Sequence, residues 1–260
     1  MKIVLFINGT LGLRILDYVT EFYGNDLDSV FVNSDDKQVP GYFGEVKSLL
    51  EKRHLQVPVL PWNEDSSKGE NFRINFNLPT LGVSALFGHV LPGELVENFS
   101  QGILNLHPSL LPIGRGADPI PWSIIDQQKQ GISIHLIDHK LDTGNLVFQK
   151  EITSTIDMNA GEIYDLAISE LFIAFSSHFP NWLGGEIEAY PQAATGISFH
   201  RSSELKSMSI FDECEVGTFG EFVRRLQATT FSNGKRPCFK DKTGSIWNID
   251  FKISARYTSE

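Results

Sequence analysis

The chain has 260 residues, a formal net charge of −10 and two cysteines. Hydrophobic residues make up 41% of it and charged residues 21%, which is ordinary for a globular protein and excludes a disordered or low-complexity chain. The acidic balance argues against a protein whose main task is to bind the phosphate backbone of nucleic acid. Cys214 and Cys238 form no C-x-x-C pair and no disulfide framework, which is typical of a reducing cytoplasm.

The N-terminal residues contain an apolar run that ends after five residues, at Ile7. This run is shorter than the apolar region of a signal peptide and has no small-residue cleavage site after it. No stretch approaches the ~20 apolar residues of a membrane span. We therefore expect a cytoplasmic protein that does not contact a membrane.

The charge is distributed unevenly along the chain. Residues 196–260 carry a net charge of +2, so the preceding residues carry −12. The composition changes between Gly184 and Gly196, which predicts two domains, residues 1–184 and residues 185–260.

The first half of the chain alternates short apolar runs with amphipathic segments. A helix is expected after the first strand, with Leu13, Leu16 and Val19 on one face, and residues 65–69 read as a polar loop. Strands that alternate with helices predict an α/β fold with a Rossmann-like, largely parallel sheet. The expected strands are residues 2–7, 30–33, 57–60, 81–87 and 102–107, and a second helix is expected at residues 45–54.

The second half begins with a helix expected to be capped by Asp118, to start at Pro119 and to end at Gly131. Beyond residue 196 the pattern changes to short β-like runs with a hairpin turn at residues 241–244, which predicts a small β-rich C-terminal domain. The other expected elements are strands at residues 132–138, 145–152, 238–240 and 245–253, and helices at residues 159–183 and 219–228.

Two groups of polar residues stand out as candidates for chemistry. Asn105 and His107 lie two residues apart near the end of an apolar strand, so they share one of its faces. Asp142 follows 35 residues beyond His107, in an Asp-Thr-Gly sequence. Each group alone also fits a plain structural interpretation, a polar strand end and a common turn. We single them out as a candidate amide, imidazole and carboxylate set.

Other polar residues are less distinctive. His135, Asp138 and His139 resemble metal ligands, but His135 and Asp138 point to opposite faces of a strand, so we expect no metal and a packed or hydrogen-bonded His135. Ser109 lies in no G-x-S-x-G sequence, which argues against a serine hydrolase. The first strand is followed by residues 8–12, which lack the G-x-G-x-x-G spacing of a nicotinamide dinucleotide site.

Taken together, these sequences resemble the formyltransferase family that uses 10-formyltetrahydrofolate, over residues 1–183. The resemblance rests on residues 105–112, residues 115–119, Gly131 and residues 137–145. It implies a catalytic triad of Asn105, His107 and Asp142. In that family an amine attacks the formyl carbon, the amide stabilises the oxygen that becomes negative, and the imidazole removes a proton. The carboxylate orients the imidazole and stabilises its protonated form.

The resemblance also implies a folate pocket, in which backbone groups of two loops bind the pterin. A further wall residue, Leu110, belongs to the stretch that follows His107. The loop residues are Gly88, His89, Val90 and Leu91 in one loop and Asp138, His139, Lys140 and Leu141 in the other.

The resemblance leaves several candidates for the amine that accepts the formyl group. The tail lacks the positive charge of a methionyl-tRNA formyltransferase, and glycinamide ribonucleotide formyltransferases lack such a tail. Residues 114–123, 196–201 and 225–231 resemble enzymes that formylate nucleotide-linked amino sugars. We expect a dTDP-4-amino-4,6-dideoxyhexose as substrate, with the 3-amino isomer as the alternative, and we weigh both against a non-catalytic folate- or nucleotide-binding regulator.

The expected substrate contacts are of two kinds. Backbone N–H groups that follow the first strand could bind a phosphate or the sugar, although a plain turn explains the same residues. Arg115 could pair with the diphosphate and Trp122 could line the sugar or base site, although both also fit a structural role. The residues after the first strand are Asn8, Gly9 and Thr10. The short β-rich tail needs a partner to cover its apolar face, which predicts a homodimer.

Overall fold

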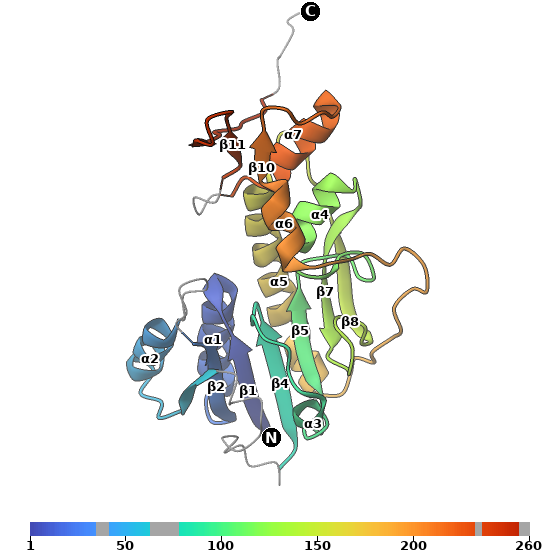
Figure 1. Ribbon diagram of the computed structural model, residues 1–260. Helices are drawn as coiled ribbons and strands as arrows, with labels where there is room; N and C mark the ends of the chain where they lie inside the picture. The colour runs from blue at the N-terminus through green and yellow to red at the C-terminus, as the bar shows by residue number, and fades with distance from the viewer. Residues whose placement is uncertain (35–41, 63–77, 232–235, 255–260) are drawn as a thin grey trace, which may run out of the picture. The chain divides into compact units, whose positions relative to one another are not determined.

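The computed structural model describes residues 1–34, 42–62, 78–231 and 236–254 (Figure 1). The polar loop expected at residues 65–69 lies outside these ranges. The chain forms two compact units, and each draws on several separate stretches of sequence. The first unit comprises Met1–His107, Ser133–Phe148 and Ser169–Gln192, and the second comprises Pro108–Ile132, Gln149–Ile168 and Ala193–Glu260.

A seven-stranded sheet with strand order β3-β2-β1-β4-β5-β7-β8 carries the fold (Figure 1). The strands from β3 to β5 pair in parallel, and β7 is antiparallel to β5. This arrangement confirms the predicted α/β fold with a largely parallel sheet. The strands are β1 (Lys2–Ile7), β2 (Leu27–Asn33), β3 (Val59–Trp62), β4 (Thr80–Ala85), β5 (Ile103–His107), β7 (Gln130–Leu136) and β8 (Leu146–Ile152).

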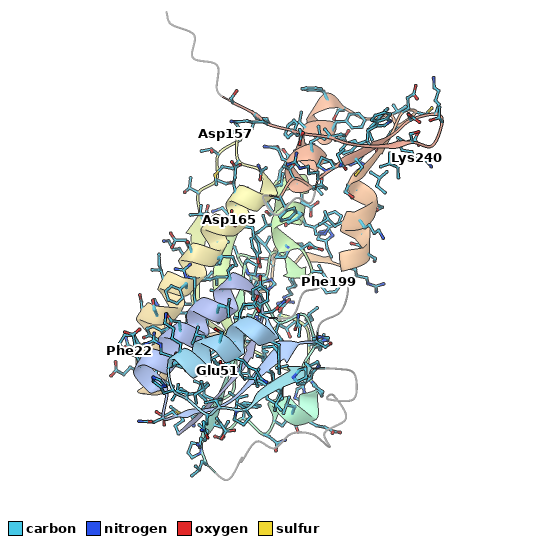
Figure 2. All side chains as sticks on the ribbon, turned by 90° about the vertical axis from the view of Figure 1, so that its left-hand side faces the viewer. Phe22, Glu51, Asp157, Asp165, Phe199 and Lys240 are labelled. Atoms are coloured by element: carbon cyan, nitrogen blue, oxygen red, sulfur yellow. The ribbon has the colours of Figure 1, made fainter. Side chains whose placement is uncertain are left out.

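Helices of the first unit bury one apolar face and expose the other. In α1 the residues Leu11, Ile15 and Leu16 are fully buried, because their helical spacing places them on one side. The outer side carries exposed residues such as Phe22 on α1 and Glu51 on α2 (Figure 2). The helices are α1 (Gly9–Tyr23), α2 (Phe43–Lys52), α3 (Gly93–Val96) and α5 (Ala160–Leu183), which begins in the second unit.

An aromatic cluster lies at one side of the central strands. The ring of Phe6 stacks on Phe31 with centroids 5.1 Å apart and meets Phe87 edge-on at 5.6 Å. Leu91 is 6% exposed and belongs to the same cluster. Partly buried Phe87 and buried Leu91 both pack in this cluster and anchor the loop between them, while the intervening residues face solvent.

The second unit contains short elements, including a three-stranded sheet in the order β10-β11-β12. The helix predicted at residues 219–228 and the strand predicted at residues 238–240 are confirmed. No helix in the described ranges combines the length and apolar character that a bilayer crossing requires. The elements are β6 (Arg115–Gly116), α4 (Pro119–Ile125), β9 (Phe199–His200), α6 (Ser202–Met208), β10 (Ile210–Asp212), α7 (Phe219–Ala228), β11 (Cys238–Lys240) and β12 (Ile246–Asn248).

The end predicted for the helix after Pro119 is wrong. The helix α4 stops at Ile125, because Gln127 takes a left-handed conformation with φ 54° and turns the chain away. Gly131 is therefore no helix terminator and lies inside β7. A Cβ atom there would come within 2.6 Å of the Lys150 carbonyl oxygen and 2.7 Å of Leu110, so this glycine permits a close approach between segments. Asp118 occupies the N-cap position, but its side chain makes no cap hydrogen bond.

Two strand boundaries also differ from the prediction. The strand expected at residues 57–60 is β3, two residues later, because Pro61 is tolerated in an edge strand and Trp62 anchors its end in the core at 2% exposure. The strand expected at residues 245–253 is only three residues long. The Ile249 N–H continues the register by donating to the Pro237 carbonyl oxygen at 2.8 Å, but Pro237 has no N–H to return the bond, so the ladder ends there.

The hairpin between β11 and β12 gives a pH-dependent prediction. Hydrogen bonds from Thr243 and Trp247, with the backbone N–H of Ser245, lower the pKa of Asp241 to about 2. A lowered pKa means that the carboxylate stabilises the hairpin fully above its ordinary value of 3.8 and loses that effect as the pH falls through about 2. The indole N–H signal of Trp247 in NMR spectra should therefore stay constant from pH 5 to pH 3. A titration centred near pH 4 would contradict this assignment.

Candidate active site

The predicted Asn105 and His107 project from the same face of β5. The antiparallel pairing of β5 with β7 places Asn105 opposite His135 and His107 opposite Ser133. His107 is 7% exposed, and His135 is 1% exposed. The polar cluster therefore lies on the face of a strand pair within the first unit, with two buried imidazoles.

Asp142 reaches this cluster from the loop between β7 and β8. Its Oδ1 atom lies 3.9 Å from Nδ1 of His107 and 3.5 Å from Nε2 of His135, and its side chain is 7% exposed. The structure thus brings together the three residues that the sequence predicted. At 3.9 Å the contact with His107 is electrostatic, longer than a hydrogen bond, and a nearby carboxylate stabilises the protonated form of an imidazole.

His135 fixes the side-chain amide of Asn105. Its Nδ1 atom lies 2.8 Å from the carbonyl oxygen of Leu136, which can only accept, so Nδ1 carries the hydrogen. In the neutral ring Nε2 is then an acceptor, and it lies 3.1 Å from Nδ2 of Asn105. One amide hydrogen of Asn105 is used in this bond, which leaves the second to donate to a bound molecule.

The sequence predicts a packed or hydrogen-bonded His135 and gives this residue no part in the site. The structure confirms that it is buried and hydrogen-bonded, and it also shows which residue it supports. The signal lies in the strand register: His135 and Asn105 are directly opposite only because β5 and β7 are antiparallel. A single sequence does not contain that pairing.

The loop that carries Asp142 is ordered by its own polar residues. The carboxylate of Asp138 accepts hydrogen bonds from the Thr143 hydroxyl at 2.7 and 2.8 Å and from the Lys140 backbone N–H at 3.0 Å. The predicted folate-binding residues Asp138, His139, Lys140 and Leu141 are all exposed, and the next residue, Asp142, is buried. The exposed residues of this loop are therefore adjacent in sequence to a member of the buried polar cluster.

The second loop predicted to bind folate follows β4. Leu86 has φ 53°, a left-handed conformation that is strained for a residue with a branched side chain. The Gly88 N–H donates to the Asn33 side chain at 3.3 Å. Gly88, His89 and Val90 are exposed, whereas Leu91 is buried in the aromatic cluster. Leu91 therefore anchors the loop through its side chain, and only its backbone remains for a ligand.

The residues after β1 begin helix α1. Asn8 is its N-cap residue but makes no side-chain cap hydrogen bond, and its buried Oδ1 atom has no hydrogen-bond partner among the described residues. Gly9 is partly buried and Thr10 is exposed. The start of the helix thus offers N–H groups and a buried amide oxygen without a partner on adjoining residues, which is compatible with the predicted substrate contact.

The other predicted binding residues, Leu110, Arg115 and Trp122, belong to the second unit. The ring of Trp122 is 7% exposed and stacks on His200 with centroids 3.9 Å apart and an interplanar angle of 6°. His200 also lies 3.0 Å from the Asp126 carboxylate. Trp122 therefore has a packing role within this unit, and its contact with substrate stays a prediction, as do those of Leu110 and Arg115.

The cluster of the first unit can stabilise a negative oxygen and move a proton. The free N–H of Asn105 is a fixed donor, because His135 holds the amide. The imidazole of His107 can accept a proton, and the Asp142 carboxylate favours the charged ring. A donor beside a base suits the attack of an amine on a carbonyl carbon without a protein nucleophile.

Known proteins are similar in sequence to part of this chain. The sequence model of the family described as formyl transferase matches residues 1–169. Methionyl-tRNA formyltransferase from Listeria monocytogenes is 32% identical over 121 residues, which are 46% of this chain and 39% of that protein. The chain thus matches less than half of the length of this curated relative.

Solved structures share the fold over most of the chain. A 4-N formyltransferase from Francisella tularensis superposes with a TM-score of 0.79 at 19% identity and covers 98% of both chains. The formyltransferase PseJ from Anoxybacillus kamchatkensis, in complex with UDP-4,6-dideoxy-4-formamido-L-AltNAc and tetrahydrofolate, has a TM-score of 0.57 and 25% identity. It covers 80% of this chain and 89% of its own. Because the family match spans the strands and loop that carry Asn105, His107, His135 and Asp142, the chain belongs to the formyl transferase family.

Proposed function

We propose that this chain is an N-formyltransferase that moves the formyl group of 10-formyltetrahydrofolate to the amine of a nucleotide-linked amino sugar. The observation that carries the proposal is the clamped amide of Asn105, held by His135 on the same strand face as His107. A hydrogen-bond donor in a fixed position stabilises charge that develops only during the reaction. A protein that only bound folate would have no use for such a donor beside a base.

Each residue of the cluster has a distinct task in this reaction. Asn105 donates its free N–H to the formyl oxygen as that oxygen becomes negative. His107 takes a proton from the nitrogen of the attacking amine and returns a proton to the folate nitrogen as the bond between that nitrogen and the formyl carbon breaks, which releases tetrahydrofolate. Asp142 stabilises the imidazolium ring of His107, and its Oδ1 atom also lies 3.5 Å from Nε2 of His135. No covalent bond to the protein is required.

The folate donor supplies an activated formyl group, and two loops of the first unit suit it. Residues 88–90 and 138–141 are exposed, while each loop is anchored by a buried neighbour, Leu91 or Asp142. Exposed backbone N–H and C=O groups match the alternating donors and acceptors of a pterin edge. The predicted wall residue Leu110 belongs to the second unit.

The acceptor that we propose is a dTDP-4-amino-4,6-dideoxyhexose. The acidic chain and its tail of net charge +2 disfavour tRNA. The Francisella 4-N formyltransferase superposes over 98% of the chain with a TM-score of 0.79, against 0.59 for methionyl-tRNA formyltransferase from Clostridium thermocellum over the same share. In the first unit we assign Asn8, Gly9 and Thr10 to the sugar nucleotide, and the contacts of Arg115 and Trp122 with it stay predictions from the sequence.

A substrate panel tests this function. The purified chain with 10-formyltetrahydrofolate should add the mass of one formyl group to a dTDP-linked 4-amino sugar. The panel also contains the 3-amino isomer, the UDP-linked sugars, glycinamide ribonucleotide and methionyl-tRNA. Preference for one of these would reassign the acceptor, and binding without turnover across the panel would favour the regulator.

We also propose that β12 mediates a homodimer. Ile246 and Trp247 are 64% and 60% exposed on a strand at the edge of a three-stranded sheet, and such an edge can pair with a second copy. Replacing Ile246 with lysine should give the mass of one chain in light scattering, because a charge opposes edge pairing. Phe22→Lys is the matched control, since Phe22 is 61% exposed on α1 in the first unit (Figure 2). A wild-type protein that is monomeric at all concentrations would contradict the dimer.

A further inference from the structure

A glutamine far along the chain holds the loop that carries Asp142. The Nε2 atom of Gln192 donates to the backbone carbonyl oxygens of Asp142 and Gly144, at 2.9 and 2.8 Å. The partners are 50 and 48 residues away in sequence. Two carbonyl groups of one loop therefore converge on a single amide that follows α5.

The same segment has a second attachment to the loop. Leu146 and Tyr190 form an antiparallel bridge, with reciprocal backbone hydrogen bonds of 2.7 and 2.8 Å. Residues 190–192, which we name the strap, therefore run beside residues 142–146. All of these residues belong to the first unit.

The loop has a conformation that needs external support. Asp142 has φ 54°, in the left-handed region that residues with a Cβ atom disfavour. Gly144 packs so closely on the preceding strand that a Cβ atom would lie 1.8 Å from the Leu136 carbonyl oxygen. Asp138 holds the loop by accepting hydrogen bonds from Thr143 and Lys140, and these bonds do not involve the carbonyl groups of Asp142 or Gly144. The strap supplies those bonds.

We propose that Gln192 is a positioning residue for formyl transfer: by binding the carbonyl groups of Asp142 and Gly144, it sets the place of the Asp142 carboxylate between His107 and His135. This inference rests on the proposed function of the triad. The carboxylate lies 3.9 Å from one imidazole and 3.5 Å from the other. A change in the Asp142 backbone would alter both distances at once.

The chemistry of the glutamine side chain accounts for its use here. Its NH2 group offers two hydrogens, one for each carbonyl oxygen. Methionine has a similar length and shape but no donor. Glutamate has the same shape but presents only oxygen atoms when ionised, and these would repel both carbonyl groups. Methionine therefore tests the loss of the two hydrogen bonds, and glutamate tests repulsion of the two carbonyl groups.

The chain contains a matched control for this role. Gln227, in α7 of the second unit, is 6% exposed and also bridges two backbone carbonyl groups of a distant segment, those of Ile156 and Met158. Its removal costs hydrogen bonds of the same kind. Gln227 has no contact with Asp142 or with the cluster on β5 and β7 among those described.

The experiment compares Gln192→Met, Gln192→Glu and Gln227→Met in the full chain. We expect Gln192→Met to lower kcat about tenfold, since small displacements of a catalytic group have effects up to about 10²-fold. The KM for the sugar nucleotide should change by less than about twofold, because Gln192 acts on the chemical step. Gln192→Glu should lower kcat further, and Gln227→Met should leave kcat unchanged even where it lowers Tm.

Amide hydrogen exchange gives a readout that does not depend on turnover. Gln192→Met should speed exchange at residues 142–146, and Gln227→Met should not. If the wild-type chain is active, a Gln192→Met variant with the same kcat, or with the same exchange rates at residues 142–146, would overturn the positioning role of Gln192. Failure of the proposed function would appear differently, as a wild-type chain that formylates no member of the panel.

Discussion

Replacing His107 by alanine is expected to lower kcat for formyl transfer by about 10²–10⁴-fold, the usual contribution of a positioned general base. The imidazole is 7% exposed and lies 3.9 Å from the carboxylate of Asp142, so it is held beside a group that favours its protonated form. Alanine leaves the attacking amine without a proton acceptor in this place. Steady-state turnover, with mass detection of the formylated product, measures the effect.

A second histidine serves as the control. His178 on α5 is partly buried, hydrogen-bonds to the Ala174 carbonyl oxygen at 2.8 Å and packs against Phe148. His178→Ala should therefore cost some stability and leave kcat near the wild-type value. Turnover in His107→Ala within about threefold of wild type would contradict the assigned role, since a lost base costs at least about 10². Circular dichroism and nucleotide binding would show whether the variant is folded.

The sequence predicts the central part of the site because one strand contains it. Alternation along β5 requires Asn105 and His107 to share a face, and this requirement holds whatever the neighbouring strands are. Asp142 was predicted from the resemblance of its Asp-Thr-Gly sequence to a family. The structure shows how the loop brings its carboxylate back to the strand pair, at 3.5 Å from His135.

The supporting residues could not be predicted in the same way. His135 meets Asn105 only through the register of two antiparallel strands, and Gln192 meets Asp142 across 50 residues of sequence. Both contacts are long-range, so no local pattern records them. Neither the glutamine after a helix nor the histidine in an apolar strand lies in a sequence pattern that indicates its role.

Glycine and proline residues also gave wrong element boundaries where tertiary packing determines the end of a helix or strand. Gly131 follows a helical pattern, which predicts that the helix ends there, yet its role is to let the Lys150 carbonyl oxygen approach within 2.6 Å of where a Cβ atom would be. The sequence predicts a strand that ends at residue 60, before Pro61, yet β3 is an edge strand that includes this proline. Strand edges and close backbone contacts are properties of the assembled sheet.

Replacing Asn105 by alanine should lower kcat about 10²–10³-fold, equivalent to about 2.7–4 kcal/mol of transition-state stabilisation. The donor acts mainly on charge that develops during the reaction, so KM for the sugar nucleotide should change little. Asn145→Ala is the control, since Asn145 is exposed and lies in the loop beyond Asp142. Asn105→Asp keeps the shape and removes the donor, and near-normal turnover in either Asn105 variant would refute the role.

The contact between Asn105 and His135 makes this prediction more specific. If His135 acts by holding the amide through its 3.1 Å hydrogen bond, His135→Ala should slow turnover less than Asn105→Ala, because the donor is still present but no longer fixed. The double variant should then be no slower than Asn105→Ala alone, since His135 has nothing left to position. Multiplicative losses in the double variant would show that His135 contributes independently, through the Asp142 carboxylate 3.5 Å away. The double-mutant cycle therefore separates the two contacts that the His135 Nε2 atom makes.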